Sequence, residues 1–183
     1  MDIDAQWAPG DKQISFTRMP PGALWRQAWI WTIVPNGTGL TKLAKGQDAR
    51  WSPTGIVFDA PARGSDADLF VVRADGTGLR RLTATRALEW PAAWSPDGRK
   101  ILFTRAESEH VSDVFVMNAD GSHVRRLTAT RSSVAGAWSP DGSTIVFTKG
   151  RARGSPLCLM RADGSHQRAL MRSSTAAFDP SWR

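Results

Sequence analysis

The chain has 183 residues, a length that suits one well-cored domain better than two. Hydrophobic residues make up 41% and charged residues 22%, which is the balance of a globular protein and excludes a disordered chain. No apolar run approaches the roughly 18–20 residues that a membrane-spanning helix needs. The first ten residues, MDIDAQWAPG, contain neither a basic segment nor an apolar one and predict no signal peptide. The net charge of +7 suits an anionic partner, and it equally suits arginines on a solvated surface.

An internal repeat governs the chain. Five tryptophans recur 43 or 44 residues apart, at Trp7, Trp51, Trp94, Trp138 and Trp182. A turn and a short apolar strand follow each of the first four: ISF from Ile14, IVF from Ile56, ILF from Ile101 and IVF from Ile145. The turn is Ser-Pro-Asp-Gly in the third and fourth units, WAPGDK replaces it in the first, and WSPTGIVF in the second predicts a tighter turn.

A second pair of strands completes each unit. The third strand reads WIWTIV, DLFVVR, DVFVMN and PLCLMR in the four units, and an Asn-Gly or Asp-Gly turn leads from it to a short fourth strand, RRLT in the middle two. Both residues of such turns tolerate positive φ, which suits tight hairpins. The β-branched and aromatic enrichment favours strands, and no stretch sustains a helical period.

Repeats of about 40–45 residues with four strands each are typical of a β-propeller. We therefore expect an all-β fold of four-stranded antiparallel blades in a single domain over residues 1–183. The repeats are expected at about 1–46, 47–90, 91–134 and 135–178, and residues 179–183 begin a fifth. One Trp per blade, Trp7, Trp51, Trp94, Trp138 and Trp182, is expected to fill the seam between neighbouring blades.

The motifs WSPDG, KILF, DVFVMNADG and RRLT resemble the PD40 (WD40-like) repeat of the TolB-like propeller family. The resemblance implies a non-catalytic scaffold for protein interaction or ligand binding, at the bacterial cell envelope, where the propeller of TolB-like proteins binds a peptidoglycan-associated lipoprotein. It also suggests a periplasmic or extracellular location. The repeat is similar to the propellers of tricorn-type and prolyl-oligopeptidase-type peptidases as well, so the alternative is an accessory domain whose catalytic domain is absent.

The number of blades leaves three arrangements open, because propellers usually have four to eight. The chain is a partial or open propeller with a surplus inner strand, or it associates with a second copy to complete a ring, or it closes as a four-bladed ring. Unpaired strand edges recruit other chains and disfavour an open monomer.

The residues that carry chemistry predict no catalytic site. RGSDA at 63–67 and RGSPL at 153–157 lack the second glycine of a nucleophile elbow. His123 and His166 follow the same turn in different repeats, which disfavours a shared metal site, and we expect neither a metal nor a cofactor. The turn aspartates Asp75, Asp120 and Asp163 are expected to accept hydrogen bonds from nearby backbone amides. Cys158 aligns with strand phenylalanines and is expected to be buried.

The longer loops, which lie at one end of the blades, are the predicted binding surface. Basic and acidic residues alternate on this rim, and we select six candidates: Lys45, Asp48, Arg86, Glu89, Arg131 and Arg172. One interpretation is a rim that docks an acidic protein surface or an anionic small molecule, and the other is a solvated edge without a ligand. We expect a protein partner and neither nucleic acid nor membrane insertion, since the aromatic residues lie at core positions of the repeat.

Overall fold

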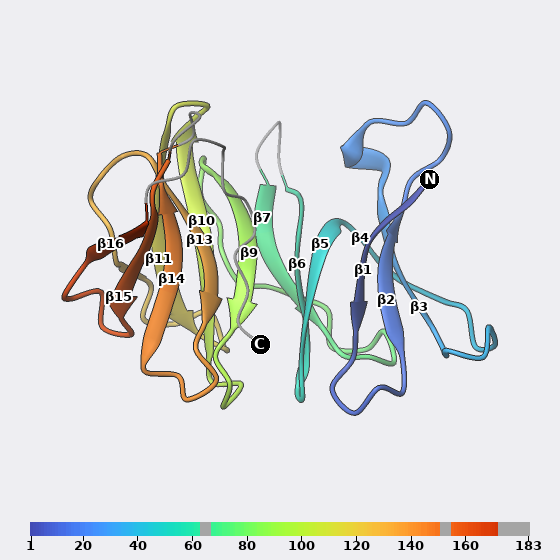
Figure 1. The fold of residues 1–183 in the computed structure, drawn as a ribbon. Helices are drawn as coiled ribbons and strands as arrows, with labels where there is room; N and C mark the ends of the chain where they lie inside the picture. The colour runs from blue at the N-terminus through green and yellow to red at the C-terminus, as the bar shows by residue number, and fades with distance from the viewer. Residues whose placement is uncertain (63–66, 151–154, 172–183) are drawn as a thin grey trace. The chain divides into compact units, whose positions relative to one another are not determined.

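The computed structural model describes residues 1–62, 67–150 and 155–171, and the chain divides into two compact units, Met1–Arg86 and Ala87–Arg183. Each unit contains two four-stranded antiparallel sheets (Figure 1). In every sheet the strands lie in chain order, so each strand pairs with the one before it and the one after it. This confirms the all-β class and the four-stranded blade predicted from the repeat.

The first unit holds sheets 1 and 2. Sheet 1 comprises β1 (Asp2–Trp7), β2 (Ile14–Arg18), β3 (Trp29–Ile33) and β4 (Thr41–Lys45). A short 3-10 helix, Trp25–Gln27, lies in the loop between β2 and β3. Sheet 2 comprises β5 (Gln47–Ser52), β6 (Gly55–Pro61), β7 (Ala67–Val72) and β8 (Arg80–Arg81).

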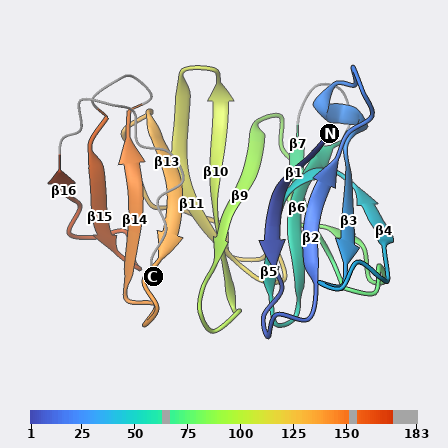
Figure 2. The same cartoon turned by 45° about the vertical axis from the view of Figure 1, so that its right-hand side comes forward.

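The second unit holds sheets 3 and 4. Sheet 3 comprises β9 (Leu88–Trp94), β10 (Lys100–Ser108), β11 (Val111–Asn118) and β12 (Arg125–Arg126). Sheet 4 comprises β13 (Ser133–Trp138), β14 (Thr144–Lys149), β15 (Leu157–Arg161) and β16 (Arg168–Met171). The two sheets of this unit meet through β13, which contacts β9, β10 and β11. Figure 2 shows β13 beside β11.

Apolar side chains pack between the two sheets of each unit. In β10, Leu102 belongs to the apolar cluster that sheet 3 shares with sheet 4, together with Phe147 and Trp138 of the latter. The first unit repeats this arrangement, since Ile30 of sheet 1 packs with Phe58 of sheet 2. Burying these side chains between the sheets stabilises each unit by roughly 25 cal/mol per Å² of apolar area.

The turns follow from their sequences. In the third repeat Ser95 Oγ donates to Asp97 Oδ1 (2.6 Å) and accepts from the Lys100 amide (2.9 Å), and Gly98 has a φ of +67°. Ser139 and Asp141 repeat these contacts in the fourth repeat. In the second repeat Ser52 pairs directly with Gly55, which confirms the tighter turn predicted there.

The prediction that each repeat tryptophan is buried between neighbouring blades is wrong for Trp7. Trp94 and Trp138 are buried and Trp51 is half-buried, but Trp7 is 56% exposed. The reason is the direction of its side chain. Trp7 pairs with Ile14 in the sheet and lies on the face opposite Ser15, the residue through which sheet 1 meets sheet 2. Trp182, the last predicted anchor, and residues 179–183 lie outside the described residues.

Candidate functional site

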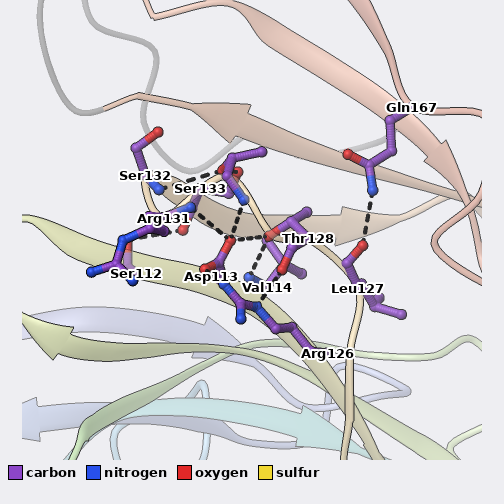
Figure 3. A network of polar contacts seen from close by, with 11 residues as sticks. Ser112, Asp113, Val114, Arg126, Leu127, Thr128, Arg131, Ser132, Ser133 and Gln167 are labelled. Atoms are coloured by element: carbon purple, nitrogen blue, oxygen red, sulfur yellow. Dashed lines mark hydrogen bonds and ion pairs between the residues drawn. The ribbon is translucent and has the colours of Figure 1, made fainter.

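A buried aspartate in sheet 3 organises the long-loop end of that sheet (Figure 3). Asp113 lies in β11 and is 3% exposed. Its Oδ1 accepts hydrogen bonds from Thr128 Oγ1 (2.7 Å) and from the backbone amides of Thr130 (3.0 Å) and Arg131 (3.2 Å). Its Oδ2 accepts from Arg126 Nη2, so both carboxylate oxygens hold the chain that follows β12. We call this arrangement the Asp113 clasp.

Arg126 and Thr128 complete the clasp from the other side. Arg126 Nε donates to the Thr128 carbonyl (2.6 Å), and Thr128 Oγ1 accepts from the Val114 amide (3.0 Å). The two-residue strand β12 supplies few backbone hydrogen bonds to the sheet. The side chains of Arg126 and Thr128 therefore hold the segment that follows it.

Sheet 2 contains the same clasp around Asp68, which is fully buried. Asp68 accepts from Arg81 Nη2 and from the Thr85 amide (3.1 Å). Arg81 Nε donates to the Thr83 carbonyl (2.7 Å), and the Leu69 amide donates to Thr83 Oγ1 (2.9 Å). In both repeats the string RLTATR supplies the hydrogen-bond partners of a buried aspartate. The sequence analysis did not select this aspartate as a site residue.

The clasps determine how two of the predicted rim residues are presented. Arg131 and Arg86 each end an RLTATR string, and both are exposed. The backbone of Arg131 is held by Asp113 with a φ of +61°, and in Figure 3 its guanidinium points away from that carboxylate. Within the described part of the chain, neither guanidinium forms an ion pair.

The remaining rim candidates differ in exposure. Lys45 is exposed at the end of β4, and Asp48 is half-buried in β5 with a φ of +53°. Glu89 does not lie on the surface, because its side chain is fully buried in β9 and pairs with Arg105 (Nε to Oε1, 2.5 Å). Arg172 lies outside the described residues. Arg86 and Arg131 therefore occupy equivalent positions after β8 and β12, each within its own unit, and the burial of Glu89 removes it from the set of accessible groups.

Asp59 is the buried acid with the most unfavourable surroundings. It is 2% exposed, its Oδ2 accepts only a long bond from Gln47 Nε2 (3.3 Å), and its Oδ1 has no hydrogen-bond partner among the described residues. Burial, with a smaller contribution from the charge of Asp48, raises the pKa of Asp59 well above its usual value.

The turn residues have the structural roles that the sequence predicted. Oδ1 of each turn aspartate accepts from the amide two residues later, at 2.8–2.9 Å, for Asp75, Asp120 and Asp163. Cys158 is buried, 4% exposed, and burial raises the pKa of its thiol. In the ranges 1–62, 67–150 and 155–171, no three His, Cys, Asp or Glu side chains are grouped as a metal site would require. Over the same ranges, no helix is both long and apolar enough to cross a membrane.

Comparison with known families identifies the repeat. Residues 6–183 match the family model of the TolB beta propeller domain. The chain belongs to this family. A TolB homolog from Chlorobium luteolum is 36% identical over 59 residues, which are 32% of this chain and 14% of that protein.

Solved structures share the fold. TolB from Acinetobacter baumannii aligns over 99% of this chain and 45% of its own, with a TM-score of 0.76 and 16% identity. A putative TolB from Agrobacterium tumefaciens aligns over 94% and 62%, with a TM-score of 0.78 and 18% identity. Dipeptidyl peptidase 4 from Porphyromonas gingivalis aligns over 91% and 25%, with a TM-score of 0.68 and 14% identity. The chain thus spans less than half of the curated TolB homolog and of the Acinetobacter protein.

Proposed function

We propose that this chain is a non-catalytic propeller scaffold, one domain over residues 1–183, that binds an acidic surface of a protein partner. The observation that carries the proposal is the pair of clasps. They fix the two segments that end in Arg86 and Arg131 and leave both guanidinium groups exposed. Membership of the TolB propeller family supports a scaffold role, at the cell envelope, over a catalytic one.

Rigid presentation matters for affinity. An arginine on a mobile loop loses conformational entropy when it binds, whereas a segment already fixed loses less. Guanidinium groups also bind carboxylates through two parallel hydrogen bonds, which gives geometric specificity in addition to charge. Arg86 in the first unit and Arg131 in the second therefore each suit a carboxylate of the partner.

The alternative, an accessory domain of a serine peptidase, is supported by the fold shared with dipeptidyl peptidase 4. It predicts that the chain associates stably with a separate α/β-hydrolase, and that this association is unaffected by the rim arginines. In the scaffold proposal the rim arginines decide which protein is bound.

The test compares two variants that remove the same charge. In Arg86→Gln/Arg131→Gln the rim loses both guanidinium groups, and in the control Arg99→Gln/Arg161→Gln two exposed arginines at the turn end are removed. Proteins retained by each immobilised chain are quantified by mass spectrometry, and the main one is purified and titrated. We expect the rim variant alone to weaken binding of that purified protein by about tenfold or more, since each charge-assisted bond contributes roughly 1.5–3 kcal/mol. Equal binding by both variants would contradict the proposal.

A further inference from the structure

A pocket lies between sheets 3 and 4, at the end of the second unit where the short turns lie. Every described residue that bounds it belongs to that unit, with Asp97, Lys100 and Arg125 on the side of sheet 3 and Trp138 and Asp141 on the side of sheet 4. Its volume of about 260 Å³ is slightly below the roughly 300–1,000 Å³ typical of ligand pockets, so it suits a small molecule. We call it the turn-end pocket.

The indole of Trp138 bounds the turn-end pocket and has an unused hydrogen-bond donor. The side chain is 7% exposed, and its Nε1 is buried without a partner among the described residues. In the first unit the equivalent Trp51 Nε1 donates to Ser15 Oγ (2.7 Å). In sheet 3 the place of Ser15 is taken by Leu102, which packs with Trp138 and has no hydroxyl. An acceptor atom of a bound molecule that reaches Nε1 would remove the cost of leaving this donor unsatisfied.

Two cations at the pocket are positioned without being neutralised. Arg125 Nη1 donates to the backbone carbonyl of Asp163 (2.6 Å), and Lys100 Nζ donates to Asn118 Oδ1 over a long distance (3.3 Å). Within the part of the chain that the structure describes, neither cation forms an ion pair. Both therefore retain the capacity to bind a carboxylate of a ligand.

Two aspartates bring the opposite charge to the pocket. Asp97 Oδ1 accepts from Ser95 Oγ (2.6 Å) and from the Arg99 amide (3.0 Å), and these bonds lower the pKa of Asp97. Hydrogen bonds, the largest from Ser139, lower the pKa of Asp141 to about 2. Both carboxylates are therefore charged at neutral pH. Because the two bonds to Asp97 end on Oδ1, its Oδ2 is available to accept from a ligand.

The first unit does not have these cations at the equivalent places. By strand register, Gln13 and Thr41 of sheet 1 occupy the places of Lys100 and Arg125 in sheet 3. The cations thus occur in the unit whose repeat tryptophan has no hydroxyl acceptor. This coincidence favours a set of groups that serves one ligand over scaffold contacts that each repeat needs.

We propose that the turn-end pocket binds a small zwitterion with an apolar side chain, either an α-amino acid or a dipeptide. The carboxylate of the ligand contacts Arg125 and Lys100. Its ammonium group contacts Asp97 Oδ2, and its side chain packs against Pro96 and the Trp138 ring. A simple anion would be repelled by both aspartates and a simple cation by Arg125 and Lys100, so a ligand with both charges suits the pocket best. The inference goes beyond the proposed protein partner and does not depend on it.

The experiment titrates the whole chain with L-leucine, L-phenylalanine and leucyl-leucine by isothermal titration calorimetry, and follows the indole N–H resonance of Trp138 by NMR. We expect saturable binding of at least one of these ligands together with a shift of that resonance. The affinity should fall about five- to tenfold in Arg125→Gln. It should stay unchanged in Arg80→Gln, the register-equivalent exposed arginine of sheet 2.

Modified ligands separate the two charges. The amide of the tightest ligand has no carboxylate and its N-acetyl form has no ammonium group, so each should bind about tenfold or more weakly. Asp97→Asn keeps Oδ1 as the acceptor of the turn and removes the charge, and it should weaken the zwitterion but not the N-acetyl form. The substituted side chains are exposed, and circular dichroism checks that the variants fold.

Four outcomes would overturn the turn-end pocket as a zwitterion site. They are no saturable binding of any of the three ligands, binding that leaves the Trp138 resonance in place, binding that Arg125→Gln does not weaken, and an amide or N-acetyl form that binds as tightly as the zwitterion. The last outcome would identify a site for a simple cation or a simple anion. The protein partner is tested separately with Arg86→Gln/Arg131→Gln, residues that do not bound this pocket, so either proposal can fail alone.

Discussion

Sheets 1 and 3 have the same strand order and register, yet they place different chemistry where the third strand meets the fourth. Sheet 3 has Asp113, Arg126 and Thr128 there and forms a buried clasp. Sheet 1 has Trp29, Lys42 and the small Ala44 in the register-equivalent places. The comparison teaches that the same backbone ladder accommodates different side chains at the long-loop end of a blade.

Among the four sheets only sheet 1 keeps part of the set, the base Lys42 without the acid. Sheet 2 has the full clasp set in Asp68, Arg81 and Thr83. Sheet 4 has Pro156 and Ala169 at the first two places and so has neither charge. A buried carboxylate at this place without its donors would be costly, and both clasp acids, Asp68 and Asp113, have theirs.

The largest expected effect concerns the repeat tryptophans of the two units. Trp138→Ala should lower the free energy of unfolding by about 3–5 kcal/mol, because the side chain is 7% exposed and packs in the core of the second unit. Trp7→Ala should change it by less than about 1 kcal/mol, since that side chain is 56% exposed. Urea denaturation followed by circular dichroism measures both. Equal losses would show that Trp7 is as well covered as Trp138.

A smaller loss is expected when the clasp of sheet 3 is removed. Asp113→Ala leaves two backbone amides and the Thr128 hydroxyl without their acceptor. It should lower the free energy of unfolding by about 2–4 kcal/mol, because each of these donors that water does not reach costs roughly 1–3 kcal/mol. The matched control is Asp163→Ala in an exposed turn, where water replaces the lost bonds. The same denaturation experiment decides, and a cost no larger than that of the control would contradict the clasp.

The smallest effect is a gain, at a β6 position where sheet 2 differs from the other three. Asp59 is replaced there by Thr17, Thr104 and Thr148 in the other sheets. Its raised pKa means that the folded state favours the neutral carboxyl. The stabilisation from proton binding is therefore complete below the unfolded pKa of about 3.9 and is lost as pH rises through the folded value.

Asp59→Thr should accordingly raise the free energy of unfolding by about 1–2 kcal/mol at pH 7 and by less at pH 4. Denaturation at the two pH values measures the difference. Asp59→Asn, which keeps the shape of the side chain, separates the removal of charge from the change of volume. A variant that is less stable at pH 7 than at pH 4, relative to the wild type, would contradict the assignment.

The features that recur with the period of the repeat were predicted correctly from the sequence. The tryptophan spacing, the Ile-x-Phe strands and the Asp-Gly turns each recur in register, and the four-stranded sheets follow from them. The exposure of Trp7 and the burial of Glu89 could not be predicted from the sequence. Burial depends on which face of a strand meets another sheet and on a cross-strand partner such as Arg105. The clasp was missed for a related reason. Asp68 and Asp113 recur in the sequence, but their partners are identified only by the register of β7 with β8 and of β11 with β12.

The central claim is that buried carboxylates hold the rim arginines in place before any partner binds. Amide hydrogen exchange of Thr130 and Arg131, followed by NMR on the whole chain, tests it most directly. The account predicts slow exchange at both amides in the wild type, because Asp113 Oδ1 accepts from each, and fast exchange in Asp113→Ala while the β10 amides remain protected. Fast exchange at both amides in the wild type would contradict it.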